Sequence, residues 1–378
     1  MTNPPRLYDT AVIGGGLAGL ALAIQLSKKG HLVALFERET YPFHKVCGEY
    51  ISLESRSFLG SLGIPLDEWA LPAISRVAIS SPNGNLLRQT LPLGGFGISR
   101  FKLDAALAEK ARCAGAHLYE NTKVTGVEFD GRLFHIASSR GPFLAKTVCA
   151  SYGKRSNLDV KWKRPFIQKS KRKNYIAVKY HVQGNFPEDE IALHNFPGGY
   201  CGLSKIEEDR YCLCYLTRAV NLKKCNQSIA EMENLVLKKN PRLREIFGQS
   251  QFVFHEPLTI SQISFAKKTQ VENHILFVGD AAGMITPLCG NGMSMALHAA
   301  KIAADNLDLF LRGACSRDEL ESGYTKQWND LFANRLRIGR LLQVFFGHPF
   351  LSRILIGLLK PFPGIVRRLI KKTHGDSF

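Results

Sequence analysis

A glycine-rich turn between two apolar strands constrains the fold of this chain more than any other feature. Residues 8–13 are predicted as a buried strand, residues 17–29 as a helix, and residues 31–36 as a second strand. The letters GGGLAG at positions 14–19 connect the first strand to the helix. This order of elements predicts a βαβ unit of the kind that binds dinucleotides.

The three glycines of the turn each allow a different backbone geometry. Gly14 allows the tight turn out of the strand, Gly16 lets the backbone approach a pyrophosphate, and Gly19 lets helix and strand pack closely. Glu37 ends the second strand, where its carboxylate can accept hydrogen bonds from both ribose hydroxyls and would repel a 2′-phosphate. A glycine-rich turn without a ligand is the alternative, and it leaves this combination unexplained.

A second glycine-rich segment lies near the C-terminal third of the chain. A short apolar strand is predicted over residues 275–278, followed by GDAAG at 279–283, Pro287, GNG at 290–292 and a helix over 293–309. This arrangement resembles the second FAD motif of the para-hydroxybenzoate hydroxylase superfamily. The resemblance implies FAD as the cofactor, with Asp280 on its ribitol chain. The start of the helix would lie at the flavin's pyrimidine edge, where the helix dipole stabilises negative charge.

Two further segments are compared with the same superfamily. Arg100, with Leu103 and Asp104 behind it, resembles an RxxLD segment whose arginine reaches the cofactor. An ordinary helix start with Asp104 in its first turn is the alternative. Tyr152 stands where the family usually has an aspartate that serves both FAD and the nicotinamide donor. This departure weakens any prediction of how NAD(P)H would dock.

The segment KVCGE at 45–49 resembles the KxCG segment of the geranylgeranyl reductase-like branch of this superfamily. The GDAAG letters and GGYCG at 198–202 are similar to that branch as well. For Cys47 two interpretations stay open: a thiol that shapes the substrate pocket beside the flavin, or a small buried apolar residue. No adjacent histidine is present to make Cys47 a thiolate nucleophile.

The predicted fold class is α/β, α+β overall: a Rossmann-type FAD-binding domain of the GR2 type with an inserted antiparallel-sheet substrate domain and a helical C-terminal tail. We expect the FAD-binding domain at 1–72, 97–165 and 256–325, the substrate domain at 73–96 and 166–255, and a basic helical cap at 326–378. The residues that we predict to contact the cofactor are Gly14, Gly16, Leu17, Ala18, Gly19, Glu37, Arg38, Lys45, Arg100, Val124, Gly279, Asp280, Pro287, Gly290, Asn291, Gly292 and Met293.

Positive charge is concentrated in two segments of a chain whose formal charge is +18. Residues 161–173 hold seven basic side chains, and residues 331–375 contain no Asp or Glu at all. A basic, apolar, helical tail suits the surface of an anionic membrane. The alternatives are a C-terminal cap with a solvated basic face and, least favoured without a nucleic-acid-binding fold, a nucleic-acid contact.

The sequence gives no sign of a secreted protein, a membrane-spanning protein or a metalloprotein. The 378 residues predict two domains, and neither a secretory signal nor an apolar run long enough for a transmembrane helix is found. Nine scattered cysteines predict reduced thiols in a cytoplasmic protein and no metal site. His181, His194 and His255 have no spacing or acidic neighbour that marks a catalytic group, so we expect structural roles.

The sequence therefore predicts an FAD-dependent oxidoreductase that acts on a lipophilic small molecule. As a member of the reductase branch, it would transfer hydride from reduced flavin to a C=C bond, with NAD(P)H or another electron donor. The alternative is an NAD(P)H-dependent flavin monooxygenase (hydroxylase) acting on an aromatic or polyketide/quinone-like substrate, since one scaffold serves both reactions. A flavin-binding protein without enzymatic activity is the third possibility.

Overall fold

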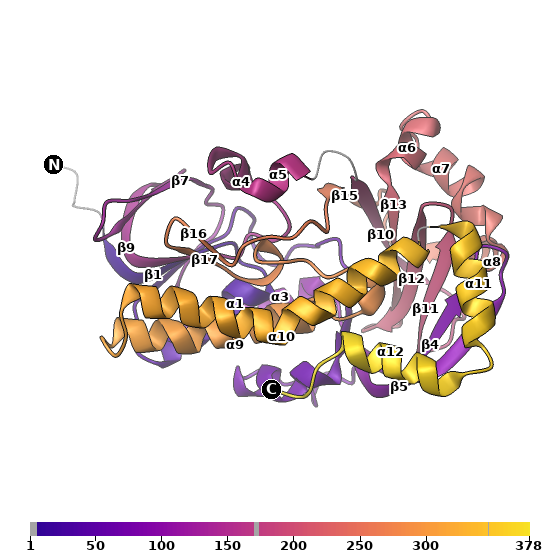
Figure 1. Cartoon of the computed structure of the whole chain (residues 1–378), viewed down its shortest axis with the longest axis horizontal. Coiled ribbons are helices and arrows are strands. Elements are labelled where there is room, and N and C mark those ends of the chain that lie inside the picture. The colour runs from indigo at the N-terminus through magenta and orange to yellow at the C-terminus, as the bar shows by residue number, and fades with distance from the viewer. Residues whose placement is uncertain (1–5, 170–173, 347) are drawn as a thin grey trace.

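The computed structural model describes residues 6–169, 174–346 and 348–378 of the chain. Its strands form two separate sheets, one at each end of an elongated molecule, and long helices run between them (Figure 1). The basic segment expected at 161–173 falls partly outside the described residues, because Lys171, Arg172 and Lys173 belong to the gap.

The first sheet contains the predicted dinucleotide-binding unit. Within the described residues its central strand order is β16 (Val271–Glu272), β17 (Ile275–Phe277), β9 (Gly141–Ala150), β1 (Leu7–Ile13), β2 (Val33–Phe36) and β6 (His117–Tyr119). Strand β8 (Phe134–Ser138) pairs with β9, and β7 (Val124–Phe129) pairs with β8. The strands β17, β9, β1, β2 and β6 pair in parallel. Their carboxyl ends therefore meet at one edge, where this class of sheet binds its ligands.

Two buried helices cover the parallel strands. Helix α1 (Leu17–Lys28) is apolar almost throughout, because it packs between the sheet and α9 (Gly292–Leu311). Helix α3 (Arg100–Cys113) lies beside α1 and begins at Ser99, whose hydroxyl accepts the Lys102 N–H as an N-cap. The elements predicted from the two glycine motifs are all present, with bounds within a few residues of the expected ones.

The second sheet is mostly antiparallel. Within the described residues its order is β14 (Gln251–Phe252), β10 (Tyr175–Gln183), β13 (Arg210–Arg218), β12 (Gly199–Ile206), β11 (Glu190–Phe196), β4 (Ala73–Ser80), β5 (Leu86–Gly97) and β3 (Tyr50–Ser52), with β15 (Leu258–Ile263) on β10. β3 and β15 belong to this sheet, although the sequence assigned their residues to the nucleotide-binding part. The exact domain limits remain a proposal.

Strand β10 is buried on both faces. Val178 and Tyr180 face one core, and Lys179 and His181 on the opposite face are fully buried as well. The second face is covered by the segment 44–49, which the sheet holds through polar contacts described below. The antiparallel sheet therefore shares a polar interior with the nucleotide-binding part.

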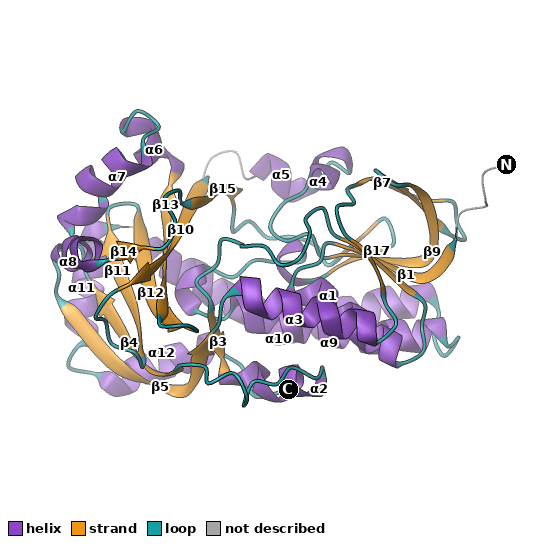
Figure 2. Ribbon diagram, turned by 180° about the vertical axis from the view of Figure 1, so that it is seen from behind, coloured by secondary structure: helices purple, strands orange, loops and turns teal. Residues whose placement is uncertain are grey.

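The remaining helices surround this frame (Figure 2). The short ones are α2 (Arg56–Ser61), α4 (Asn157–Lys161), α5 (Pro165–Lys169), α6 (Ala219–Lys224), α7 (Ile229–Leu235) and α8 (Pro241–Gln249), with 3-10 turns η1 (Leu53–Ser55), η3 (Leu237–Lys239), η4 (Gly279–Ala281) and η5 (Pro287–Cys289). The C-terminal part forms α10 (Arg317–Phe346), α11 (Pro349–Leu359) and α12 (Pro363–Thr373).

The C-terminal helices return to the second sheet. Helix α10 runs beside α9, α11 approaches β11, and α12 lies along β5 (Figure 1). The last residue, Phe378, stacks on His298 with ring centroids 4.0 Å apart. In the described part of the chain, no single helix has the length and apolar composition to cross a membrane. The pair α10–α11, bent by 110°, passes that test by length and composition alone.

Candidate functional site

The glycine turn has the geometry that its spacing predicts. Gly14 adopts a φ of +106°, and a Cβ atom added to it would lie 2.6 Å from the Cα of Tyr152. A Cβ atom on Gly19 would lie 2.0 Å from the carbonyl oxygen of Gly14. A larger residue at position 19 would therefore push α1 away from the turn after β1, and one at position 14 would push the turn away from the segment after β9.

Gly16, in contrast, faces two cationic side chains across open space. A Cβ atom on Gly16 would lie 3.6 Å from Nη2 of Arg100 and 3.9 Å from Nζ of Lys45. Asp104 pairs with both cations, at 2.7 Å from Nε of Arg100 and 3.0 Å from Nζ of Lys45. A pyrophosphate at the start of α1 would thus meet backbone N–H groups and two positive charges.

Asp104 offsets the effect of burial on the charge of Arg100. Burial alone would raise the pKa of Asp104, but the charges of Arg100 and Lys45 hold that pKa below its usual range. Burial alone would likewise lower the pKa of Arg100, and the attraction of Asp104 raises it instead. Asp104 is therefore the positioning partner of Arg100. It is the fifth residue of α3 and not part of its first turn, where the alternative interpretation of this segment expected it.

Glu37 lies buried at the end of β2. Its Oε2 accepts the Gly15 N–H at 2.8 Å, and its Oε1 accepts the Arg38 N–H at 2.8 Å. The carboxylate therefore stabilises the glycine turn as well as presenting acceptor capacity to a ribose. The Arg38 side chain is exposed and pairs with Glu39, 3.2 Å away.

Other predicted contact residues take positions around the same edge. Leu17 and Ala18 are buried in the first turn of α1, and Val124 is buried at the start of β7. Tyr41, which sequence reasoning missed, donates its hydroxyl to the Gly15 carbonyl at 2.6 Å. No sequence pattern marks this contact, because it depends on how residues 38–49 fold over the turn.

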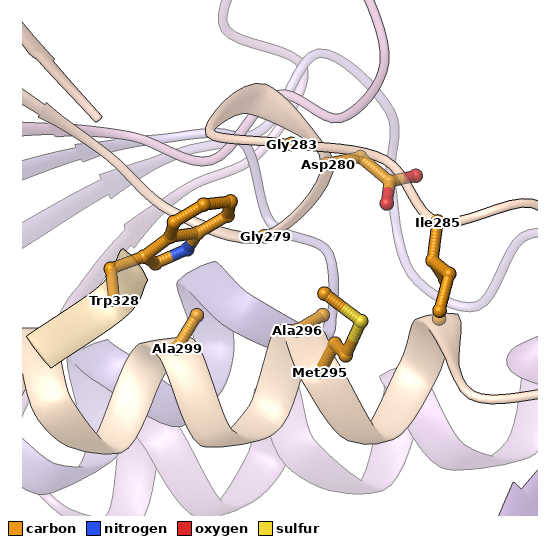
Figure 3. Close-up of a pocket in the computed structure, with 9 residues that line it drawn as sticks. Gly279, Asp280, Gly283, Ile285, Met295, Ala296, Ala299 and Trp328 are labelled. Atoms are coloured by element: carbon orange, nitrogen blue, oxygen red, sulfur yellow. The ribbon is translucent and has the colours of Figure 1, made fainter. Parts of the chain in front are cut away.

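Asp280 lies on the loop above α9, and Trp328 reaches the same loop from α10 (Figure 3). Burial raises the pKa of Asp280, and the nearby positive charges of Lys268, Arg100 and Lys154 offset part of that effect. Lys268 donates to the backbone carbonyls of Asp280 at 2.6 Å and of Lys154 at 2.7 Å. Gly279 and Asp280 are thus held in place by a buried lysine that the sequence motif does not include.

The turn that leads into α9 carries an unsatisfied buried amide. Asn291 is fully buried, and neither Nδ2 nor Oδ1 has a hydrogen-bond partner within the described part of the chain. Leaving such an amide unpaired costs about 1–3 kcal/mol, so a ligand with matching groups is expected there. The pyrimidine edge of a flavin offers one N–H donor flanked by carbonyl acceptors, which fits Asn291.

The residues on either side of Asn291 form the turn that leads into α9. Gly290 has a φ of +63°, a left-handed conformation that glycine adopts without strain. Pro287 begins the preceding 3-10 turn with an exposed ring, whereas Gly292 and the buried Met293 begin α9. The predicted contact residues at this end of the site therefore lie at the N-terminus of a long helix.

Tyr152, the departure from the family pattern, belongs to a buried ionic network. Its hydroxyl donates to Oδ1 of Asp159, which also lies 3.0 Å from Nη1 of Arg164. Arg164 is fully buried, donates to the carbonyl of Ala281 at 3.1 Å, and lies 3.5 Å from the ring centroid of Phe277. This arginine supports the GDAAG loop from below and does not contribute to a basic surface.

The segment that contains Cys47 is clamped by the second sheet. Lys179 Nζ donates to the Lys45 carbonyl at 3.1 Å, and Cys212 Sγ donates to the Cys47 carbonyl at 3.2 Å. Glu49 accepts from Lys179 Nζ and from His181 Nε2, the latter at 2.6 Å. The structure thereby assigns His181 to an interdomain contact that the sequence did not reveal.

Cys47 itself lies beside Arg100 and Glu49. Burial raises the pKa of the Cys47 thiol, with Arg100 offsetting part of the rise. The surroundings of Cys47 thus favour the neutral thiol over the thiolate.

An apolar pocket opens between the second sheet and the C-terminal helices. About 840 Å³ of space, part of it continuous with solvent, lies within its walls. The sheet contributes Val77, Leu91 and Leu193, and the loop before α9 contributes Leu288, Cys289 and Gly290. Helices α10–α12 form the opposite wall. The pocket therefore extends from the predicted flavin-contact loop into an almost wholly apolar space.

Metal ligation has no candidate in the described ranges, since no group of three or more His, Cys, Asp or Glu side chains there could hold an ion. All nine cysteines are free thiols.

The glycine turn lies within the segment that matches a known protein family. Residues 12–45 match the family model described as an NAD(P)-binding Rossmann-like domain. The chain is 26% identical to conditioned medium factor receptor 1 of Dictyostelium discoideum, over 94% of this chain and 72% of that protein. It is 27% identical to a digeranylgeranylglycerophospholipid reductase of Methanosarcina acetivorans, over 86% of this chain and 81% of the reductase.

Solved structures share the whole architecture. A flavin-dependent brominase superposes with a TM-score of 0.79, at 20% identity, over 97% of this chain and 93% of the brominase. A geranylgeranyl bacteriochlorophyll reductase-like protein from Thermoplasma acidophilum gives 0.78 at 18% identity, over 99% and 97% of the two chains. The p-nitrophenol 4-monooxygenase of Pseudomonas putida gives 0.75 at 17% identity, over 97% of both.

Fold, site and comparisons together define the class of fold: a Rossmann-type domain with a second sheet, shared with flavin-dependent enzymes. Within that class, the relatives support the geranylgeranyl reductase-like branch of the FAD superfamily. The predicted fold class and family resemblance are thereby confirmed, and the flavin-dependent neighbours support the predicted cofactor, FAD. Which residues contact FAD, and which reaction follows, are proposals.

Proposed function

We propose that this enzyme transfers hydride from reduced FAD to a C=C bond of a lipophilic, isoprenoid-type substrate. The apolar pocket carries this proposal. Its walls join the loop at Leu288–Gly290, beside the predicted flavin edge, to a space lined by branched aliphatic side chains. Such a pocket stabilises a long hydrocarbon by burying it, and it offers no charged side chain to orient a polar substrate.

The relatives support the same class of substrate. The Methanosarcina acetivorans protein is named for the reduction of digeranylgeranylglycerophospholipid, and the alignment spans most of both chains. An isoprenoid phospholipid has both a hydrocarbon chain that suits the pocket and double bonds that a hydride can reduce. We therefore take this lipid as the first substrate to test.

Different residues would bind different parts of the cofactor and the substrate. Gly16, Lys45 and Arg100 would hold the pyrophosphate of FAD, Asp280 its ribitol, and Asn291 the pyrimidine edge. When bound, FAD supplies the redox chemistry. The aliphatic walls would position the double bond and exclude water from it. NAD(P)H or another donor would reduce the flavin.

Hydroxylation is the second candidate function. The likeness to the p-nitrophenol 4-monooxygenase favours it, because both chains share the complete two-sheet architecture. In that case an NAD(P)H-dependent flavin would activate oxygen toward an electron-rich ring. The apolar lining of the pocket favours the reductase.

Product mass spectrometry separates the two reactions. The FAD-loaded protein, reduced by dithionite without oxygen, should add two hydrogens to each double bond reduced in digeranylgeranylglycerophospholipid. The gain of one oxygen atom with NAD(P)H and air would instead establish a monooxygenase. A substrate recovered unchanged under both conditions would overturn the reductase proposal for this lipid.

A matched pair of variants connects the reaction to the pocket. Val77→Trp places a large ring in the pocket wall and should abolish turnover, while the bound flavin keeps its absorbance. Val220→Trp changes an exposed valine on α6 and should leave turnover at the parent level. Equal turnover in the two variants would show that the pocket is not the substrate site.

We also propose that the enzyme works at the surface of an anionic membrane, as the acid-free tail predicts. A phospholipid substrate resides in a bilayer, and the tail offers both apolar and basic side chains to it.

A further inference from the structure

Helices α11 and α12 expose apolar side chains on the surface that faces away from the protein. Phe350 and Leu358 on α11 are each 63% exposed, and Phe362, just before α12, is 55% exposed. Ile354 and Ile365 are exposed as well. A helix that only caps a protein presents a polar outer face to water. The outer face of α11 is apolar instead, with Arg353 the one charged residue of the helix.

Positive charge surrounds these apolar side chains. The exposed basic residues of the two helices and their connection are Arg353, Lys360, Arg367, Arg368, Lys371 and Lys372. On α12, the spacing of 367, 368, 371 and 372 puts four of them on one stripe of the helix. No acidic residue occurs anywhere between positions 331 and 375 to neutralise them.

Two other basic residues of the tail are not available to a partner. Nη1 of Arg335 lies 3.8 Å from Glu54, and burial lowers the pKa of Arg335. Burial lowers the pKa of Arg340 as well. Of the nine basic residues in the tail sequence, the six on α11, α12 and their connection therefore form one exposed group.

The inner faces of the same helices form a wall of the apolar pocket. Leu355, Ile356 and Leu359 of α11, together with Val366, Leu369 and Ile370 of α12, line it opposite the sheet. The layer that α11 and α12 form is thus one helix thick and apolar on both its outer and its inner face. In this arrangement the pocket is separated from the exposed apolar surface by α11 and α12 alone.

We propose that α11 and α12 form a bifacial cover that docks on an anionic lipid bilayer and passes a lipid chain from the bilayer into the pocket. We call the exposed side chains Phe350, Ile354, Leu358, Phe362 and Ile365 the docking face. This face enters the interfacial region of the leaflet, and the surrounding lysines and arginines attract the anionic headgroups. The inference extends the proposed function and rests on it for the identity of the lipid.

A bilayer fits this surface better than other partners do. Nucleic acid would pair with the basic stripe, but three of the five side chains of the docking face, Ile354, Leu358 and Ile365, are aliphatic and give a base no ring to stack on. A second copy of this chain would bring the same uncompensated positive charge to the interface, which repels. An anionic bilayer offers negative charge and hydrocarbon at one surface.

Vesicle flotation tests the docking face with the full-length, FAD-loaded protein. Parent protein should float with phosphatidylcholine vesicles that contain about one third phosphatidylglycerol, and high salt should weaken the binding. The triple variant Phe350→Ser, Leu358→Ser, Phe362→Ser should lose at least about tenfold in vesicle affinity. The matched control carries Val220→Ser, Leu235→Ser and Leu309→Ser, which change exposed apolar residues elsewhere, and it should float like the parent.

An inward-facing variant tests the connection to the pocket. Leu359→Trp fills the pocket from α11 and should leave flotation unchanged while it abolishes turnover of the lipid, whether the lipid is in vesicles or in detergent micelles. The outer triple variant should lose turnover in vesicles only and keep it in micelles. Flavin absorbance and thermal unfolding of each variant establish that it is folded.

The outcomes separate the docking proposal from the proposed function. If the outer triple variant floats as well as the parent, the docking face does not bind lipid and the inference is overturned. If an oligonucleotide binds the parent and displaces it from vesicles, and the triple variant binds that oligonucleotide equally well, the basic stripe serves nucleic acid and the inference is likewise overturned. Failure of the parent to reduce the lipid in micelles contradicts the proposed function, whereas flotation still decides the docking.

Discussion

Nη1 of Arg164 lies 3.0 Å from Oδ1 of Asp159, and both side chains are closed to solvent. Arg164 also donates from Nη1 to the carbonyl of Ala281 at 3.1 Å and from Nη2 to the carbonyl of Thr269 at 2.9 Å. This pair connects the segment after β9 to the GDAAG loop, two parts of the chain that are more than a hundred residues apart. The loop proposed to hold the ribitol chain of FAD is therefore supported by an ionic contact beneath it.

Arg164→Met should destabilise the protein strongly. The substitution leaves Asp159 as a buried carboxylate without its cation, and breaking a buried pair in this way costs about 3–5 kcal/mol. Urea unfolding of the FAD-free protein measures the loss. The exposed neighbour Lys163 supplies the control, since Lys163→Met should stay within about 0.5 kcal/mol of the parent. A similar small effect of both changes would show that Arg164 is dispensable.

Asp280→Ala should weaken FAD binding about ten- to a hundredfold. The change removes a carboxylate acceptor, and a hydrogen bond to a charged group contributes about 1.5–3 kcal/mol. Fluorescence titration of the FAD-free protein measures the affinity. Asp318→Ala, in the exposed first turn of α10, is the control and should bind FAD like the parent. Unchanged affinity in Asp280→Ala would place the ribitol elsewhere.

Glu37→Gln should reduce the affinity for FAD much more than the affinity for FMN, which lacks the adenosine ribose. The amide keeps one acceptor for the N–H of Gly15 or Arg38, so the turn retains part of its support. Parallel titrations with the two flavins give the ratio, and Glu39→Gln serves as the surface control. An equal loss for FAD and FMN would mean that Glu37 acts through the turn and not through the ribose.

His194 should make the fold sensitive to acid. Burial lowers the pKa of His194 from 6.5 to about 4, and the charges of Arg242 and Arg88 act in the same direction. Below the unfolded-state pKa the unfolded chain binds a proton that the folded chain excludes, so stability is lost as pH falls from 6.5 toward 4. The loss attributable to this residue is roughly 3 kcal/mol.

His194→Gln tests that expectation. The free energy of unfolding, measured in urea across this pH range, should fall less steeply in the variant than in the parent. The variant also retains a polar partner for Ser80, whose hydroxyl lies 2.9 Å from Nδ1 of His194. Identical pH slopes would show that the imidazole takes up its proton within the fold.

The nucleotide-binding unit could be predicted from sequence because its signals are local. Gly14 needs a left-handed φ, Gly19 needs the absence of a side chain, and α1 and β1 follow from the periodicity of neighbouring residues. The same reasoning found the strand before Asp280 and the helix after Asn291. The acid-free tail was also visible, although its division into α11 and α12 was not.

Only the tertiary structure decided which distant groups meet. The clamp of Lys179 and His181 on Glu49 joins residues 130 or more positions apart, and neither their spacing nor their type predicts the contact. The burial of Arg164, a residue that the sequence counts among surface charges, depends on Asp159 and Phe277 closing around it. The sequence by itself therefore determined the cofactor-binding turns, since backbone sterics and periodicity act over a few residues. The polar interior, the apolar pocket and the two-faced cover of α11 and α12 arise from packing between distant segments, which local pattern does not encode.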